Sequence, residues 1–197
     1  TGTKIEKLDA LKKEFPKINI LKFDISEHSK IEEFIENVNS QLTSLDVVVN
    51  NAGAFEFGDV INSSDKGWAK AFGINVIGAA NLVKYSLELL KQSNNASVVN
   101  IASISSFVAQ PESLPYNTSK GALLQLTRCL AMDLGRYGIR VNCICPGDIG
   151  TDGWFERGLI RQQSIDSSNP TAFVNEASKA AILGRIGSPE EVASAVA

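Results

Sequence analysis

Tyr116 and Lys120 stand four residues apart, a spacing that places both side chains on one face of a helix. An ammonium group beside a phenol favours the phenolate and lowers the pKa of the tyrosine toward the working pH. Tyr116 could then donate or accept a proton. Because a Tyr-x-x-x-Lys spacing also arises by chance, the pair needs support from its surroundings.

Two residues supply that support. Ser103 directly follows a predicted strand, where its hydroxyl could hydrogen-bond the same substrate oxygen that Tyr116 protonates. Asn75 lies within Gly73–Gly78, where two glycines and a polar residue suit a plain helix poorly. We expect a kink there, or an Asn75 side chain bonded to released backbone groups and water. The alternative is an ordinary hydrogen-bonded polar residue inside a helix.

Hydrophobic periodicity predicts the elements that must position these residues. Short apolar or β-branched runs predict strands at residues 18–23, 45–49, 98–102 and 139–145. Amphipathic stretches predict helices at residues 4–15, 30–42, 65–92 and 116–137, the last ended by Gly138. The near-continuous apolar character of the later strands is typical of a parallel sheet covered on both faces. The alternation predicts an α/β fold, a doubly wound parallel sheet of Rossmann-like three-layer α/β/α type.

Small and hydrogen-bonding residues follow three of these strands. Asn51, Ala52 and Gly53 come after the second strand, and Pro146 and Gly147 come after the fourth. Ligands of open α/β sheets bind beyond the carboxyl ends of the strands. We therefore expect a flat ligand against this edge, with a helical flap or mobile loop, residues 152–179, above the site.

Composition excludes several other classes. The 197 residues suit one domain, residues 1–197, and a net charge of −3 without a basic tract argues against nucleic-acid binding. The apolar runs are too short to cross a membrane, and no signal peptide is visible. We interpret Cys129, Cys143 and Cys145 as reduced residues of a cytoplasmic protein and expect no metal site.

Taken together, the motifs resemble those of the short-chain dehydrogenase/reductase family of single-domain type, with some similarity to 3-oxoacyl-(acyl carrier protein) reductases. The matching segments are Asp24-Ile25-Ser26, Asn50-Asn51-Ala52-Gly53, Asn75, Ser103, Tyr116-Asn117-Thr118-Ser119-Lys120, Pro146-Gly147-x-Ile149-x-Thr151 and residues 185–193. They occur in the family's order through nearly the whole chain.

The resemblance implies an NAD(P)-dependent oxidoreductase that moves a hydride between a nicotinamide cofactor and a carbonyl or secondary alcohol. It implies Tyr116 as general acid/base, Ser103 as holder of the substrate oxygen, and Asn75 as the residue that positions a water in a proton relay. Lys120 would assist Tyr116 and bind the nicotinamide ribose. The implied cofactor contacts are Asp24 and Ile25 at the adenine, Asn51, Ala52 and Gly53 at the adenosine ribose, and Pro146, Gly147, Ile149 and Thr151 at the nicotinamide.

Two family features have no counterpart in the sequence. The Gly-rich phosphate loop between the first strand and helix is missing, and so is the closing strand. Residues 1–3 resemble the end of the family's second strand, so the sheet is expected to have a gap and this chain alone to bind cofactor poorly. No carboxylate stands at Gly2 or Thr3 to bond a ribose 2′-hydroxyl, which favours NADP over NAD and makes Thr3 a candidate 2′-phosphate contact.

Simpler interpretations stay open for single residues. Asp24 could be a helix N-cap, and turn chemistry alone explains His28. Trp68, Phe72 and Tyr85 are expected in the core or at a subunit contact, whereas Trp154 and Phe155 are expected to line a substrate pocket. The alternative function is a non-catalytic dinucleotide sensor or scaffold on the same fold. The apolar surface of the two long helices predicts a homodimer or homotetramer, with a small-molecule substrate as the remaining partner.

Overall fold

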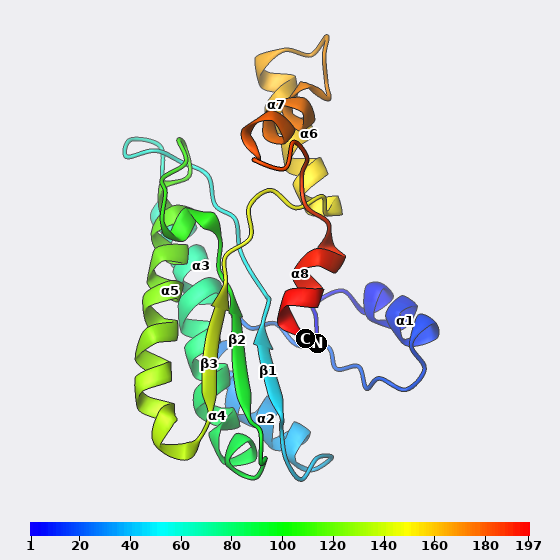
Figure 1. Cartoon of the computed structure of the whole chain (residues 1–197), viewed down its shortest axis with the longest axis vertical. Coiled ribbons are helices and arrows are strands. Elements are labelled where there is room, and N and C mark those ends of the chain that lie inside the picture. The colour runs from blue at the N-terminus through cyan, green and yellow to red at the C-terminus, as the bar shows by residue number, and fades with distance from the viewer. The chain divides into compact units, whose positions relative to one another are not determined.

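Three short strands form one sheet: β1 (Val47–Asn50), β2 (Ser97–Ile101) and β3 (Arg140–Ile144), in the order β1-β2-β3. The computed structural model, shown in Figure 1, describes residues 1–197, and it describes every side chain except those of Arg161, Ser164 and Ile165. The chain divides into two compact units, Thr1–Cys143 and Ile144–Ala197. The predicted α/β fold class with a parallel sheet is confirmed.

The first unit contains α1 (Ile5–Glu14), the 3₁₀ turn η1 (His28–Lys30), α2 (Ile31–Asn39), β1, α3 (Asp65–Phe72), the π-helical segment η2 (Gly73–Gly78), α4 (Ala79–Lys91), β2, the 3₁₀ turn η3 (Ile104–Ser106), α5 (Leu114–Leu134), the 3₁₀ turn η4 (Gly135–Tyr137) and most of β3. Four of these helical regions were predicted. Gly138 follows the last of them with φ of 73°, a left-handed conformation that glycine adopts without strain.

The core lies between the sheet and one layer of helices. Val48 of β1 and Val98 of β2 pack with Val83 and Leu90 of α4 and with Leu134 of α5. Figure 1 shows α3, α4 and α5 running along the sheet. Apolar burial of this kind, worth about 25 cal/mol per Å², is the main stabilising contribution of such a layer.

The expectation that strands are buried on both faces is correct for β2 and wrong for β1 and for β3, in which Arg140 and Asn142 are exposed. All of β2 is buried or nearly so, whereas burial alternates along β1. Val48 faces α4, but Val47 and Val49 point to the opposite face and are 47% and 41% exposed. β1 lies at the edge of the sheet, because β2 is its neighbour in the strand order and β3 lies beyond β2.

The strand predicted at residues 18–23 is also wrong. Only Lys22 pairs there, in an isolated parallel bridge with Gly2, and Phe23 N–H donates to Gly2 O at 3.0 Å. A strand needs a neighbouring strand along its length, and one residue pair does not form a ladder. Phe23 packs against α2 instead, where its ring stacks on that of Phe34 with centroids 4.2 Å apart.

A polar ladder crosses the buried end of the sheet. Asn50 and Asn100 are register partners in β1 and β2, and Asn50 Nδ2 donates to Asn100 Oδ1 at 2.8 Å. Asn100 Nδ2 donates in turn to Thr127 Oγ1 of α5 at 2.8 Å. Buried amides must find partners because an unpaired buried polar group costs about 1–3 kcal/mol.

The second unit consists of α6 (Asp152–Ile165), α7 (Ala172–Ala180) and α8 (Pro189–Val196), after the end of β3. Thr151 caps α6 by accepting from Trp154 N–H at 3.2 Å, and Ser188 and Glu191 form a capping box at α8. Residues 152–179 are thus largely helical, which agrees with the predicted helical segment rather than with the predicted loop. No helix among the described residues is long and apolar enough to cross a membrane.

Candidate active site

Lys120 links the end of β2 to the loop after β1. Its Nζ donates to the carbonyl oxygen of Ile101, the last residue of β2, at 2.8 Å. A methyl group placed on Gly53 would lie 3.7 Å from the same Nζ. The Nζ also lies 5.8 Å from the centroid of the Tyr116 ring. The structure therefore brings the predicted pair together with the predicted strand-end loop.

Lys120 lies near the start of α5. Pro115 stands in the first turn, where its missing N–H costs nothing, and the helix then runs for 21 residues. Lys120 is buried on the face toward η3, and its own carbonyl oxygen accepts from Ser106 Oγ at 2.8 Å. A buried ammonium requires such polar neighbours, because transfer of an unpaired charge from water is very costly.

Asn75 holds the loop after β1 through hydrogen bonds to the backbone of Ala54. Its Oδ1 accepts from Ala54 N–H at 2.7 Å, and its Nδ2 donates to Ala54 O at 2.9 Å and to Ser119 Oγ at 2.8 Å. The side chain is 1% exposed, and both amide protons are used. In place of the regular α-helix that this position suits poorly, the π-helical segment η2 separates α3 from α4.

Ser103 occupies the end of β2 in an extended conformation. It is buried, and its Oγ accepts from Ser105 N–H at 3.1 Å as the N-cap of η3. In that arrangement the hydroxyl proton stays available to donate to a ligand oxygen, since a hydroxyl has one donor and two acceptor positions. η3, which Ser103 caps, is tied to α5, the helix of Tyr116, through the hydrogen bond from Ser106 Oγ to the carbonyl oxygen of Lys120.

An aromatic cluster surrounds the Tyr116 ring. Phe55 lies against Tyr116 with ring centroids 4.1 Å apart, and Phe57 meets Phe55 edge-on at 4.8 Å. Phe55 follows the Asn51-Ala52-Gly53-Ala54 stretch directly, so the same loop supplies both the small residues and the aromatic contact. Such ring pairs stabilise by about 0.5–1.5 kcal/mol beyond burial and restrict the orientation of the tyrosine.

A cleft of about 620 Å³ opens beside the strand-end loop. Six predicted cofactor residues line it together: Thr3, Asp24, Ile25, Asn51, Ala52 and Gly53. Apolar walls from Phe34 and Leu82 and polar groups at one end are the chemistry that an adenosine requires. These residues fit the adenosine half of a dinucleotide.

The carboxylate in this cleft is held in a turn. Asp24 Oδ1 accepts from Ser26 Oγ at 2.7 Å and from Ser26 N–H at 2.9 Å. Hydrogen bonds from the Ser26 hydroxyl and then from its N–H hold the pKa of Asp24 below its ordinary value. The N-cap interpretation is wrong, because Glu27 precedes η1 and Lys30 precedes α2.

Four predicted cofactor residues belong to the region after β3. Ile149 pairs with Gly187 in a parallel bridge, and Gly150 N–H donates to Gly187 O at 2.9 Å. The Thr151 hydroxyl caps α6, as described above. Pro146 and Gly147 lead into this bridge. Contact of the four residues with a nicotinamide stays a prediction.

Trp154 and Phe155 form an aromatic cluster of their own inside the second unit. Trp154 lies 5.1 Å from Phe155 and 5.1 Å from Phe173 of α7, measured between ring centroids. Its Nε1–H donates to Asp148 Oδ1 at 2.8 Å. Their predicted place in a substrate pocket stays a prediction.

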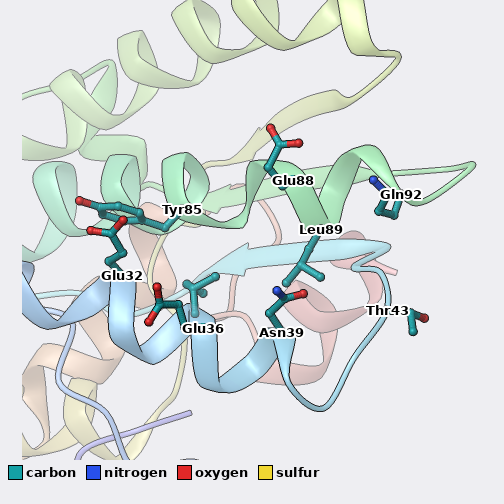
Figure 2. Close-up of a pocket in the computed structure, with 9 residues that line it drawn as sticks. Glu32, Glu36, Asn39, Thr43, Tyr85, Glu88, Leu89 and Gln92 are labelled. Atoms are coloured by element: carbon teal, nitrogen blue, oxygen red, sulfur yellow. The ribbon is translucent and has the colours of Figure 1, made fainter.

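A second cavity of about 300 Å³ lies between α2 and α4. Figure 2 shows Glu32 and Glu36 on α2 and Tyr85 and Glu88 on α4 around it. Tyr85 thus lines this acidic cavity beside the α2–α4 contact. Trp68 and Phe72 lie elsewhere, within α3, with their ring centroids 5.9 Å apart. None of the predicted site residues reaches this cavity, and the described residues hold no His, Cys, Asp and Glu group able to bind a metal.

Sequence reasoning missed three residues of the site. Ser119 joins Asn75 to the Tyr116 helix, Phe55 packs on Tyr116, and His28 Nε2 lies 2.8 Å from Gly73 O. A signal existed for Ser119, since it lies one helical turn after Tyr116, and for Phe55, since it follows the strand-end loop. None existed for His28, whose partner is 45 residues away.

Comparison with known proteins decides the family. The family model described as enoyl-(acyl carrier protein) reductase matches residues 2–197. The chain belongs to the short-chain dehydrogenase/reductase family. Its fold and family are those of NAD(P)-dependent oxidoreductases that act on alcohols and carbonyls.

Members of the family similar to this chain include oxidoreductases of small hydroxylated compounds. The L-fucose dehydrogenase of Bos taurus is 33% identical over 189 residues, covering 94% of this chain and 67% of that protein. The structure of NAD⁺-bound xylitol dehydrogenase matches with a TM-score of 0.88 at 25% identity, over 98% of this chain and 78% of the other. ElxO with NADP bound matches with a TM-score of 0.83 at 25% identity, over 98% and 77%. The chain spans between 62% and 67% of the length of three curated L-fucose dehydrogenases that it matches.

Proposed function

We propose that the protein interconverts a secondary alcohol and a carbonyl compound with NAD(P), and that Tyr116 is its general acid/base. The observation that carries this proposal is the connection of Lys120 to the Ile101 carbonyl, to the Gly53 loop and to the Tyr116 ring. These contacts join proton-transfer groups to a cleft suited to adenosine. A non-catalytic sensor would need the cleft but would have no need of the proton-transfer groups.

In the proposed mechanism Tyr116 and Ser103 act on one substrate oxygen. The phenol gives its proton to that oxygen during reduction and takes it back during oxidation, while the Ser103 hydroxyl donates a hydrogen bond to it. The ammonium of Lys120 favours the phenolate form of Tyr116. Asn75 holds the loop and the helix around them and positions the proton relay. The nicotinamide, when bound, supplies or accepts the hydride.

The cleft supports the adenosine side of the proposed cofactor contacts. Asp24 and Ile25 would flank the adenine, and Asn51, Ala52 and Gly53 would lie along the adenosine ribose. Lys120 would reach the nicotinamide ribose, and Pro146, Gly147, Ile149 and Thr151 would contact the nicotinamide. The cofactor preference proposed is NADP, because Thr3 offers a hydroxyl where a carboxylate would select the free ribose.

Fluorescence titration of the full-length protein with NADPH and NADH tests the preference. We expect the dissociation constant for NADPH to be the smaller one. Thr3→Asp should reverse the order, because a carboxylate repels a 2′-phosphate and accepts from ribose hydroxyls. Tighter binding of NADH by the unsubstituted protein would contradict the preference but not the oxidoreductase activity.

The substrate class proposed is a small compound with a secondary hydroxyl or carbonyl group. The names of the similar proteins favour sugars and polyols, while the sequence resemblance also suggests 3-oxoacyl thioesters. A panel of aldohexoses, polyols, vicinal diols and 3-oxoacyl thioesters should be assayed with the full-length protein, with Tyr116→Phe as control. Cofactor binding without turnover of any substrate would favour the sensor.

We also propose a homodimer or homotetramer in the cytoplasm, with residues 152–179 of a single domain acting as the substrate flap. Support for self-association comes from exposed apolar side chains on the long helical regions, such as Ile77 and Met132. No disulfide joins Cys129, Cys143 and Cys145, which suits a reducing compartment. A monomer by light scattering at micromolar concentration would contradict the oligomer.

A further inference from the structure

The segment of residues 24–28 touches the π-helical segment η2 at both of its ends. At the first end His28 Nε2 lies 2.8 Å from Gly73 O. At the other end the backbone of Ile25 lies so close to Gly78 that a methyl group there would stand 3.1 Å from Ile25 O and 2.7 Å from Ile25 Cγ1. Asn75 lies between these two contacts.

The i→i+5 hydrogen bonds of a π-helical segment interrupt the regular α-helical ladder, and such segments are frequent at functional sites. In this segment Asn75 reaches Ala54 and Ser119. The His28 ring lies directly against this part of the backbone, with Cε1 3.5 Å from the position that a Cβ atom of residue 73 would take, an ordinary contact distance.

The His28 bond has a fixed direction. A carbonyl oxygen only accepts, so His28 Nε2 must carry the proton. His28 is half-buried, so water competes with it only in part.

We propose that His28 is a positioning residue that acts through η2 on Asn75. It links the cofactor cleft, which Asp24 and Ile25 line, to the amide that holds the Tyr116 helix and the strand-end loop. The inference rests on the proposed function, since it assigns a catalytic consequence to the placement of Asn75.

Two substitutions in the full-length protein test the inference. His28→Leu removes the donor, and His28→Gln keeps an N–H that can reach Gly73 O. The expected effect of His28→Leu is a fall in kcat of about fivefold to tenfold, the size of one lost hydrogen bond, with KM for substrate nearly unchanged. His28→Gln should restore most of kcat. Ser29→Ala, at the exposed neighbouring position, should match the unsubstituted protein.

Hydrogen exchange supplies a readout independent of activity. Ala54 N–H donates to Asn75 Oδ1, so its protection reports directly on the placement of Asn75. His28→Leu should speed exchange at Ala54 and at Gly73–Gly78, and His28→Gln should slow it again. Unchanged protection, or a loss of kcat that His28→Gln does not reverse, would overturn the inference. If His28→Leu does not fold, His28→Gln decides: near-normal kcat and Ala54 protection support the inference, and their loss overturns it.

Two controls separate this inference from the proposed function. Asn75→Ala should lose more kcat than His28→Leu. If Asn75→Ala is impaired and His28→Leu is not, only the role of His28 is refuted. If Tyr116→Phe keeps full turnover, the proposed function itself is refuted.

Discussion

Asn75 donates a 2.8 Å hydrogen bond to the hydroxyl of Ser119, and that hydroxyl donates at 2.8 Å to the carbonyl oxygen of Tyr116. The amide in the π-helical segment is thus two hydrogen bonds away from the backbone of the proposed acid/base. Because both side chains are buried, the connection is shielded from competing water.

Removing the Ser119 hydroxyl should destabilise the first unit. In Ser119→Ala one amide proton of Asn75 stays buried without its partner, and we expect the free energy of unfolding to fall by about 1–3 kcal/mol. Chemical denaturation measures the change. Thr118→Ala is the matched control, because the Thr118 hydroxyl bonds Leu114 O on the exposed face of the same helix. A smaller loss in Ser119→Ala than in Thr118→Ala would contradict the expectation.

Tyr116→Phe should abolish most turnover without loss of cofactor binding. The phenolic hydroxyl is the only group removed, and general acid/base catalysis contributes about 10²–10⁴-fold to the rate. The ring should stay in place because its contact with Phe55, at 4.1 Å, does not require the hydroxyl. Steady-state kinetics measures the loss of turnover, and cofactor titration of the same preparation measures the retained binding. A kcat within threefold of the unsubstituted enzyme would exclude the proposed role.

Gly78→Ala and Gly73→Ala should differ although both lie in the π-helical segment. A methyl group at Gly78 would meet Ile25 Cγ1 at 2.7 Å and two carbonyl oxygens at 3.1 Å, so the Ile25 turn must move. Overpacking of this kind costs about 1–3 kcal/mol. At Gly73 the nearest atom is 3.5 Å away, an ordinary contact. In the Gly78→Ala variant, the midpoint temperature of thermal unfolding should be well below that of Gly73→Ala. Equal midpoints would show that Ile25 moves aside at no measurable cost in stability.

The ion pair of Arg185 and Glu191 should make stability depend on acid pH. Arg185 donates to both carboxylate oxygens, at 2.9 and 2.7 Å, and this lowers the pKa of Glu191 from 4.5 to about 2. A carboxyl with a lowered folded pKa stabilises above its unfolded pKa, and the contribution is lost as the pH falls through the folded pKa. The loss should fall between pH 4.5 and about 2.

Glu191→Gln should flatten the pH dependence of thermal unfolding within this interval. The pair is exposed, so about 1 M salt should reduce the difference between the two proteins by screening. An unchanged pH profile in Glu191→Gln would show that the pair contributes nothing measurable to stability.

Patterns in the sequence predicted those features that depend on local chemistry. The break at Asn75 was predicted because two glycines and an amide are poor helix formers, and the strands 98–102 and 139–145 because their apolar runs are bounded clearly. Nothing in the sequence of residues 18–23 shows that this strand does not form, because a strand requires a neighbouring strand with which to pair. His28 was missed for the same kind of reason: its partner, Gly73 O, is a backbone atom that no residue pattern marks.

The Asn50–Asn100 pair has a consequence for folding. In a parallel ladder a shift of one residue turns every side chain of a strand to the other face. The two amides meet only when Asn50 stands opposite Asn100, and any misaligned pairing would leave buried amides without partners, at about 1–3 kcal/mol each. The pair therefore selects against misaligned strands. The loop of residues 51–53 and Ser103 reach the same edge of the sheet only when Asn50 stands opposite Asn100.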